Sequence, residues 1–152
     1  MNREEIRGIV TQIADIQRFA ILSTGDPDGA PHATIVCFVA ADQLRSLIFL
    51  TPRTTRKFHN LDSGGPVSIF IDDRNDKADD IRRIYGIEAR GEVSLLDDKT
   101  GAPYRSLFRR KYPELADFTR SLGVAWCRLD VDRYDIVHRF QEVVVYRPGN
   151  HP

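Results

Sequence analysis

Short apolar runs joined by links too short for a crossover helix dominate the first third of the chain. Three such runs occupy residues 19–51, with a Gly-Asp-Pro-Asp-Gly turn at 25–29 after the first and a break at 41–43 after the second. Parallel strands need connections of a dozen or more residues, whereas antiparallel strands accept tight turns. The sequence therefore predicts an antiparallel meander of strands at 19–24, 31–40 and 46–51.

The remaining elements indicate a barrel. Because closure removes exposed sheet edges, many short strands with few helices favour a mainly β fold, a β-barrel with peripheral helices. Gly86 and Gly91 predict a bulge or a close backbone approach within a long strand. Further strands are expected at 67–72, 84–96, 123–131 and 134–146. Three helical segments are expected: one at 2–17, a short one that ends at Leu61, and one at 100–119 with a break at Pro113.

The N-terminal helix has two recognisable signals. Asn2 can cap it with Glu5 as the return partner. Its apolar residues recur at helical spacing, which indicates packing against the barrel. This stripe comprises Ile6, Ile9, Val10, Ile13 and Ile16.

Length and composition narrow the class of protein. The 152 residues suit one domain, 1–152, with the helix at 2–17 and the barrel at about 19–147. Equal numbers of basic and acidic residues, 22 of each, argue against a nucleic-acid partner. No apolar run is long enough for a membrane span, and the charged N-terminus is unlike a secretory signal, so we expect a cytoplasmic protein. Cys37 and Cys127 have no metal-ligand spacing, so we expect no metal site and two buried thiols.

A basic segment follows the third strand. Residues 51–57 hold three threonines, two arginines and one lysine, before a short amphipathic helix ending at Leu61. Hydroxyls and fixed cations at a helix start suit a phosphate group, with Thr54 or Thr55 as the helix cap. A solvated basic turn is the alternative interpretation of the same residues.

The order of these segments resembles the pyridoxamine 5'-phosphate oxidase-like family, whose members are FMN-binding split barrels of antiparallel Greek-key type. Leu50-Thr51-Pro52 occupies the place of the family's Tyr-Thr-Asn-like triplet, and Thr55-Arg56-Lys57 matches its Ser-Arg-Lys. The two strands that follow have the family's spacing. The resemblance implies an FMN-binding homodimer with the cofactor at the subunit interface.

The resemblance also assigns candidate cofactor residues. It places a phosphate and ribityl group at the basic segment and the flavin ring along the second strand, and we hypothesise that the loop at 73–75 reaches the flavin across a dimer interface. A solvated loop is the alternative for that last segment. The candidates are Thr34, Ile35, Val36, Thr51, Pro52, Thr55, Arg56, Lys57, Arg74 and Asn75.

Some family residues are missing. The family's oxidases carry Arg at the position of Thr34, Lys near Val39 and Gln near Gly86. These departures argue against true pyridoxamine phosphate oxidase activity. The favoured function is an FMN-dependent oxidoreductase acting on an unidentified small molecule. The alternatives are a split-barrel protein that binds the deazaflavin F420 or haem, or a non-catalytic flavin-binding module.

No catalytic residue is identified by the sequence. His32 and His59 lie near the proposed site and can donate a proton or a hydrogen bond to reduced flavin, although both also suit surface positions. Tyr85 and Trp126 suit either a ring stack or core packing. The carboxylate pairs at 79–80 and 97–98 fall at turns and are interpreted as solvated.

Overall fold

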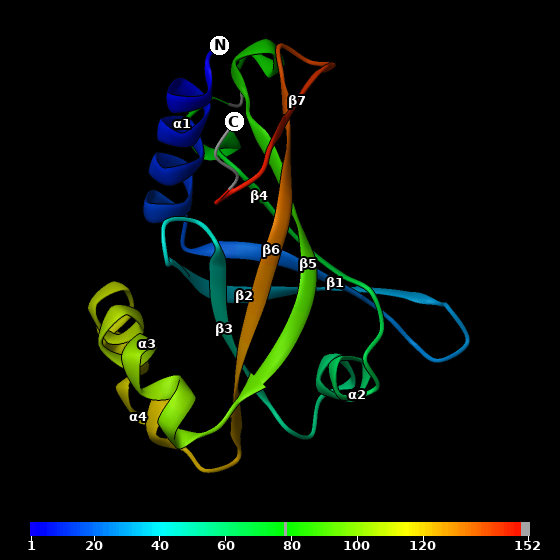
Figure 1. Cartoon of the computed structure of the whole chain (residues 1–152), viewed down its shortest axis with the longest axis vertical. Coiled ribbons are helices and arrows are strands. Elements are labelled where there is room, and N and C mark those ends of the chain that lie inside the picture. Colours follow the sequence, from blue (N-terminus) through cyan, green and yellow to red (C-terminus); the bar gives the residue numbers. More distant parts are fainter. Residues whose placement is uncertain (78, 150–152) are drawn as a thin grey trace.

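The computed structural model describes residues 1–77 and 79–149 and shows a β-barrel with helices at its periphery (Figure 1). The strands are β1 (Phe19–Gly25), β2 (Pro31–Ala41), β3 (Ser46–Pro52), β4 (Val67–Asp72), β5 (Gly86–Leu96), β6 (Val124–His138) and β7 (Glu142–Tyr146). The helices are α1 (Arg3–Ile16), α2 (Arg56–Asp62), α3 (Asp98–Lys111) and α4 (Ala116–Arg120), with 3₁₀ turns η1 (Arg74–Asp76), η2 (Ile81–Arg83) and η3 (Pro113–Leu115).

All neighbouring strands pair antiparallel, in the order β3-β2-β1-β4-β5-β6-β7. An additional pairing of β3 with β6 closes six strands into a barrel and leaves β7 outside the ring. The strand β6 is long enough for both partners, because residues 124–130 pair with β3 and residues 134–138 pair with β7. The spatial order β4-β1-β2-β3 is a Greek key. The predicted meander, mainly β class and barrel are confirmed.

The break predicted near residue 132 is wrong. The strand β6 runs without interruption to His138, and the turn into β7 contains Arg139 and Phe140, both at positive φ. Asp132 is instead a bulge residue. Gly91 pairs with Val131 and Arg90 pairs with Arg133, so Asp132 has no partner on β5. In the sequence, a polar dipeptide that forms a bulge within a strand looks the same as one that forms a turn between two strands.

Gly91 shows the predicted bulge and close backbone approach, whereas Gly86 is approached by a side chain. A Cβ at Gly91 would overlap the backbone carbonyl of Asp130 on β6, so the bulge requires glycine there. A Cβ at Gly86 would lie 2.9 Å from a ring carbon of Phe70. Both positions therefore allow the close approach of a neighbouring strand or ring.

Helix α1 packs against the core of the barrel. Asn2 and Glu5 form the predicted capping box, and Val10 is fully buried among the barrel residues. The predicted apolar stripe is wrong at its end, because Ile16 is 58% exposed. Its side chain lines a surface cavity described below.

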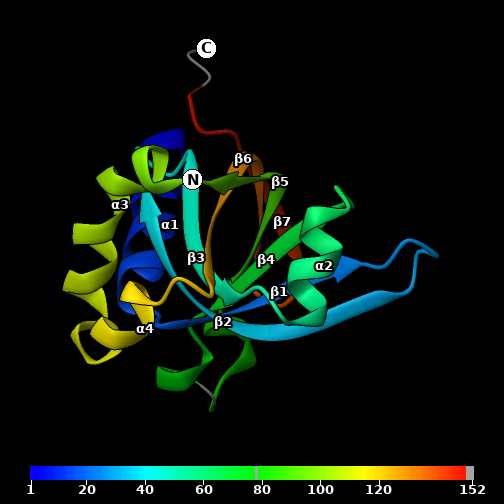
Figure 2. The same ribbon diagram turned by 90° about the horizontal axis from the view of Figure 1, so that it is seen from below.

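Helix α3 covers the outer face of β2, β3 and β6 and creates a second apolar core. Phe108, at the centre of this core, is fully buried and packs edge-on against Trp126, with ring centroids 5.7 Å apart. The helix begins at an Asp97 capping box, and a turn at Pro113 separates it from α4, as predicted. Figure 2 shows α3 and α4 on one flank of the barrel and α2 on the opposite flank.

Tyr112, just after α3, joins the helix to the barrel where strand β2 changes partner. Residues 31–37 of β2 pair with β1, and residues 38–41 pair with β3. The Tyr112 hydroxyl accepts a hydrogen bond from the Phe38 amide (3.0 Å) and lies 2.7 Å from the carbonyl oxygens of Arg18 and Phe38. The tyrosine thus satisfies backbone groups that the departing β1 strand leaves unpaired.

Candidate cofactor site

The turn between β3 and α2 is held by two threonines. The Thr55 hydroxyl caps α2 by accepting from the Phe58 amide (3.2 Å) and donates to the Pro52 carbonyl (2.9 Å). The Thr51 hydroxyl lies 2.8 Å from the Thr55 hydroxyl, and Thr51 is fully buried. Thr55, rather than Thr54, is therefore the cap, and both hydroxyls contribute to the shape of the turn.

Two cations follow this turn on the first turn of α2. Arg56 is exposed and Lys57 is half-buried. Within residues 1–77 and 79–149, neither side chain makes an ion pair or a hydrogen bond. Phe58 packs against the barrel core and fixes the helix to it. Two neighbouring cations without carboxylate partners leave this turn able to bind an anion.

The candidates on β2 alternate between the two faces of the strand. Val36 is buried in the core, whereas Ile35 is 61% exposed on the outside. Ile35 lies opposite Ile21 on β1, which in turn lies opposite Phe70 on β4. Phe19, also on the outer side, is 63% exposed. We call Phe19, Ile21, Ile35 and Phe70 the outer apolar face. The sequence does not reveal this face, because these strands carry apolar residues on both sides.

A cavity of about 460 Å³ joins the outer apolar face to the loop after β4. Arg74 and Asn75 line it together with Ile35, as do the exposed Ile16 and the half-buried Asp72. The Arg74 guanidinium pairs with the Asp72 carboxylate at 3.3 Å. Three of the ten candidates therefore share one cavity, and the α2 cations do not line it.

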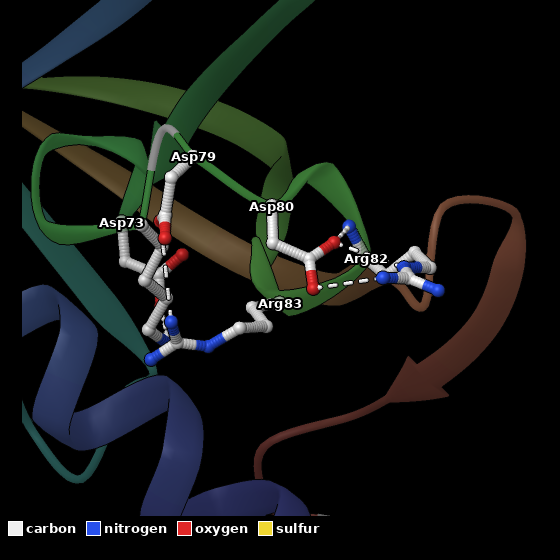
Figure 3. Close-up of polar contacts among 6 residues, drawn as sticks. Asp73, Asp79, Asp80, Arg82 and Arg83 are labelled. Atoms are coloured by element: carbon white, nitrogen blue, oxygen red, sulfur yellow. Dashed lines mark hydrogen bonds and ion pairs between the residues drawn. The ribbon is translucent and has the colours of Figure 1, made fainter.

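The loop that carries Arg74 is held by buried and exposed carboxylates (Figure 3). Asp73 is buried, accepts from the Tyr85 amide (2.8 Å) and pairs with Lys77 at 2.6 Å. In the carboxylate pair that follows, Asp80 caps η2 and its oxygens accept from Arg82, while Asp79 lies 4.0 Å from Arg83. Asp80 therefore has a structural role as a cap, whereas the Asp79 side chain is 80% exposed, as expected of a solvated carboxylate.

The two groups of candidates lie at opposite ends of β4. Helix α2 precedes Val67, where β4 begins, and η1 follows Asp72, where it ends. A strand of six residues spans about 20 Å. Arg74 and Asn75 therefore do not converge with Arg56 and Lys57 on one phosphate in a single subunit.

Tyr85 has a structural partner. Its ring stacks on that of His138, with ring centroids 5.7 Å apart, and the His138 Nε2 lies 3.6 Å from a Glu142 oxygen. Burial raises the pKa of the Cys127 thiol to about 12 and also raises that of the half-buried Cys37. Neither thiol is therefore a ready nucleophile. Among the residues that the structure describes, no cluster of three metal-ligating side chains occurs, and no helix is long and apolar enough to cross a membrane.

The closed Greek-key barrel, with its uncovered strand face and two cations at the strand–helix turn, defines a split-barrel protein. The sequence model described as pyridoxamine 5'-phosphate oxidase matches residues 4–138. The chain therefore belongs to the pyridoxamine 5'-phosphate oxidase family. Among curated proteins, none matches the sequence.

Solved structures share this fold at low sequence identity. A haem-binding protein from Mycobacterium smegmatis superposes with a TM-score of 0.84 at 15% identity, over 97% of this chain and 60% of that one. ChuZ from Campylobacter jejuni superposes with a TM-score of 0.81 at 14% identity, over 99% of this chain and 62% of that one. A Clostridium acetobutylicum protein related to general stress protein 26 superposes with a TM-score of 0.71 at 13% identity, over 95% of this chain and 96% of that one. The chain thus spans about three fifths of the first two proteins.

Proposed function

We propose that the protein binds FMN and acts as a flavin-dependent oxidoreductase on a small molecule. The observation that carries the proposal is the pair of unpartnered cations, Arg56 and Lys57, at the start of α2 in a chain of this family. A phosphate dianion is bound well by a two-pronged guanidinium beside an ammonium group. The hydrogen-bonded hydroxyls of the buried Thr51 and the half-buried Thr55 hold the backbone from which both cations project.

The residues of this chain would position the cofactor rather than react with it. Bound FMN supplies hydride or single-electron chemistry. Arg56 and Lys57 would hold its phosphate, and the backbone of β2 around Ile35 would lie along its ring. Ile35 offers an exposed apolar surface for such a ring. Thr34 and Val39 bring no cation to β2, which argues against a phosphorylated pyridoxamine as the substrate.

The first test is a titration with FMN. Arg56→Ala and Lys57→Ala should each weaken FMN binding roughly 10- to 100-fold, because each removes a charge-assisted hydrogen bond. Quenching of flavin fluorescence measures the affinity. Lys99→Ala, an exposed lysine on α3, is the matched control and should bind FMN as the parent does. Parental affinity in both α2 variants would exclude this phosphate site.

A haem-binding function is the second candidate, because the haem-binding protein from Mycobacterium smegmatis has the highest TM-score of the structures compared above. The deazaflavin F420 and a non-catalytic flavin module are further alternatives. The visible spectrum of the purified protein separates the cofactors: flavin bands support FMN, a single deazaflavin band supports F420, and a Soret band supports haem. Reduction by NAD(P)H followed by turnover with an acceptor separates an enzyme from a flavin carrier.

We also propose a homodimer formed through the outer apolar face. A transverse row of residues runs across five strands on that side: Ile35, Ile21, Phe70, Glu88 and Asp135. Its apolar end is exposed, and its charged end holds a network in which Arg133 and Asp135 pair at 2.6 Å. An uncovered apolar patch beside charged residues is typical of a protein interface.

Sedimentation velocity tests the dimer. Ile35→Glu should convert the dimer to a monomer and weaken FMN binding, because it places a charge in the proposed interface, beside the expected position of the flavin ring. Leu122→Glu introduces the same charge at a residue that is 96% exposed on the other flank, and it should stay dimeric. A monomeric parent protein would exclude the proposed interface.

A further inference from the structure

A second cluster of cations lines a cavity of about 610 Å³ beside α3 and α4. Four arginines line it, and we call Arg53, Arg105, Arg109 and Arg120 the arginine groove. They come from three parts of the chain: the loop after β3, helix α3 and the end of α4. The fold alone brings them together.

The charges around the groove do not cancel. Asp98 pairs with Arg105 at 3.1 Å. Asp97 accepts from the Thr100 amide (2.8 Å) and hydroxyl (2.9 Å), and these bonds lower the pKa of its carboxyl group. Four arginines and two aspartates leave an excess of two positive charges on the lining. Arg53, Arg109 and Arg120 form no ion pair within the described residues.

The inner wall of the groove includes apolar residues of the core. Trp126 and Leu96 form part of it, and both belong to the core beneath α3. The loop bearing Arg53 is fastened to the same wall, because the Arg53 amide donates to the Gly123 carbonyl at 3.0 Å. The Arg53 guanidinium lies 5.5 Å from the centre of the Phe58 ring. Arg53 thus projects from an anchored loop rather than from a free one.

We propose that the arginine groove binds a small polyanion that carries at least two phosphate or carboxylate groups. Each guanidinium can bind such a group with two parallel hydrogen bonds. Three unpaired arginines on different elements suit separate anionic groups better than a single one. The volume lies in the range of small-molecule sites, well above the size of one phosphate. This site is distinct from the α2 cations proposed to hold FMN.

The chain contains its own reporter for the groove. Trp126 is the single tryptophan of the sequence and lines the cavity. Titration of the purified protein with pyrophosphate should therefore change the tryptophan fluorescence in a saturable way, with one site per chain. Inorganic phosphate should bind at least ~10-fold more weakly, because it engages fewer arginines. Equal affinity for phosphate and pyrophosphate would overturn the proposal that the groove binds a polyanion.

Variants distinguish the groove from general attraction to a basic surface. The double variant Arg109→Ala, Arg120→Ala should lose at least ~10-fold in pyrophosphate affinity. Arg110→Ala removes the neighbouring exposed cation on α3, which does not line the groove, and should bind as the parent does. Equal losses in the two proteins, or no loss in the double variant, would overturn the proposal. Circular dichroism confirms folding, and Arg109→Lys, Arg120→Lys provides a folded charge-retaining comparison.

Citrate separates the two sources of negative charge. Citrate binding that the double variant also loses identifies a polycarboxylate as an occupant, whereas pyrophosphate binding alone identifies a polyphosphate. Both results support the groove as a polyanion site. Failure of both ligands to bind would overturn it, and FMN binding at α2 would be unaffected by that failure.

Discussion

The α2 turn and the arginine groove are two cationic regions that the loop containing Arg53 connects. The first uses adjacent residues, Arg56 and Lys57. The second draws its arginines from positions 53 to 120. A local segment announces its chemistry in the sequence, whereas a site assembled by tertiary packing does not. Arg109 and Arg110 look alike in the sequence, yet only Arg109 lines the groove.

The two regions also differ in what holds them. The α2 turn is fixed by hydrogen bonds within five residues, from Thr51 to Thr55. The groove depends on the position of α3, and the Tyr112 hydroxyl fixes the end of that helix to Phe38, 74 residues away in the chain. Removing each anchor should therefore affect one region and spare the other.

The largest effect is expected from Tyr112→Phe. The ring stays, but the Phe38 amide loses its buried hydrogen-bond partner, which should lower the free energy of unfolding by about 2–3 kcal/mol. Because α3 is then less firmly held, pyrophosphate affinity at the groove should fall several-fold, while FMN affinity at α2 stays within about twofold. Urea unfolding and the two ligand titrations measure these changes.

Tyr104→Phe is the matched control for Tyr112. Its hydroxyl donates to an Asp42 oxygen at 2.8 Å, and the Ser46 hydroxyl also donates to that oxygen, at 2.7 Å. The carboxylate therefore keeps a partner, and we expect a loss below about 1 kcal/mol. Equal destabilisation by the two variants would show that the Tyr112 hydroxyl has no special role where β2 changes its pairing from β1 to β3.

Much of the fold is predictable because its signals are local. The limits of β4, the Asn2–Glu5 capping box, the Thr55 cap and the close approach at Gly91 each follow from a few neighbouring residues. The continuity of β6 is not local, because Asp132 is accommodated by a bulge against β5 that is visible only once the strands are paired.

The candidate site was predictable only in part, for the same reason. The sequence identified Arg56 and Lys57 as the phosphate-binding candidates, and their contact with a cofactor stays a prediction. The sequence could not show that Arg74 lies at the far end of β4 from them, or that Ile35 and Phe70 share an exposed face. Side chains alternate between the two sides of a strand, and when both sides are apolar, the elements that cover each side decide which one stays exposed.

A smaller effect than that of Tyr112→Phe is expected from Thr55→Ala, which tests the local anchor. The change removes the cap on the Phe58 amide and the nearer of two hydrogen-bond partners of the Thr51 hydroxyl, so the free energy of unfolding should fall by about 1 kcal/mol. FMN affinity should fall several-fold, because Arg56 and Lys57 then project from a frayed first turn. Pyrophosphate affinity at the groove should not change, since the Arg53 amide remains bonded to Gly123. Thr54→Ala, at an exposed position beside the cap, is the control. If Thr55→Ala weakened pyrophosphate as much as FMN, the loop between the two regions would move as one unit, and the contrast between a local and an assembled site would fail.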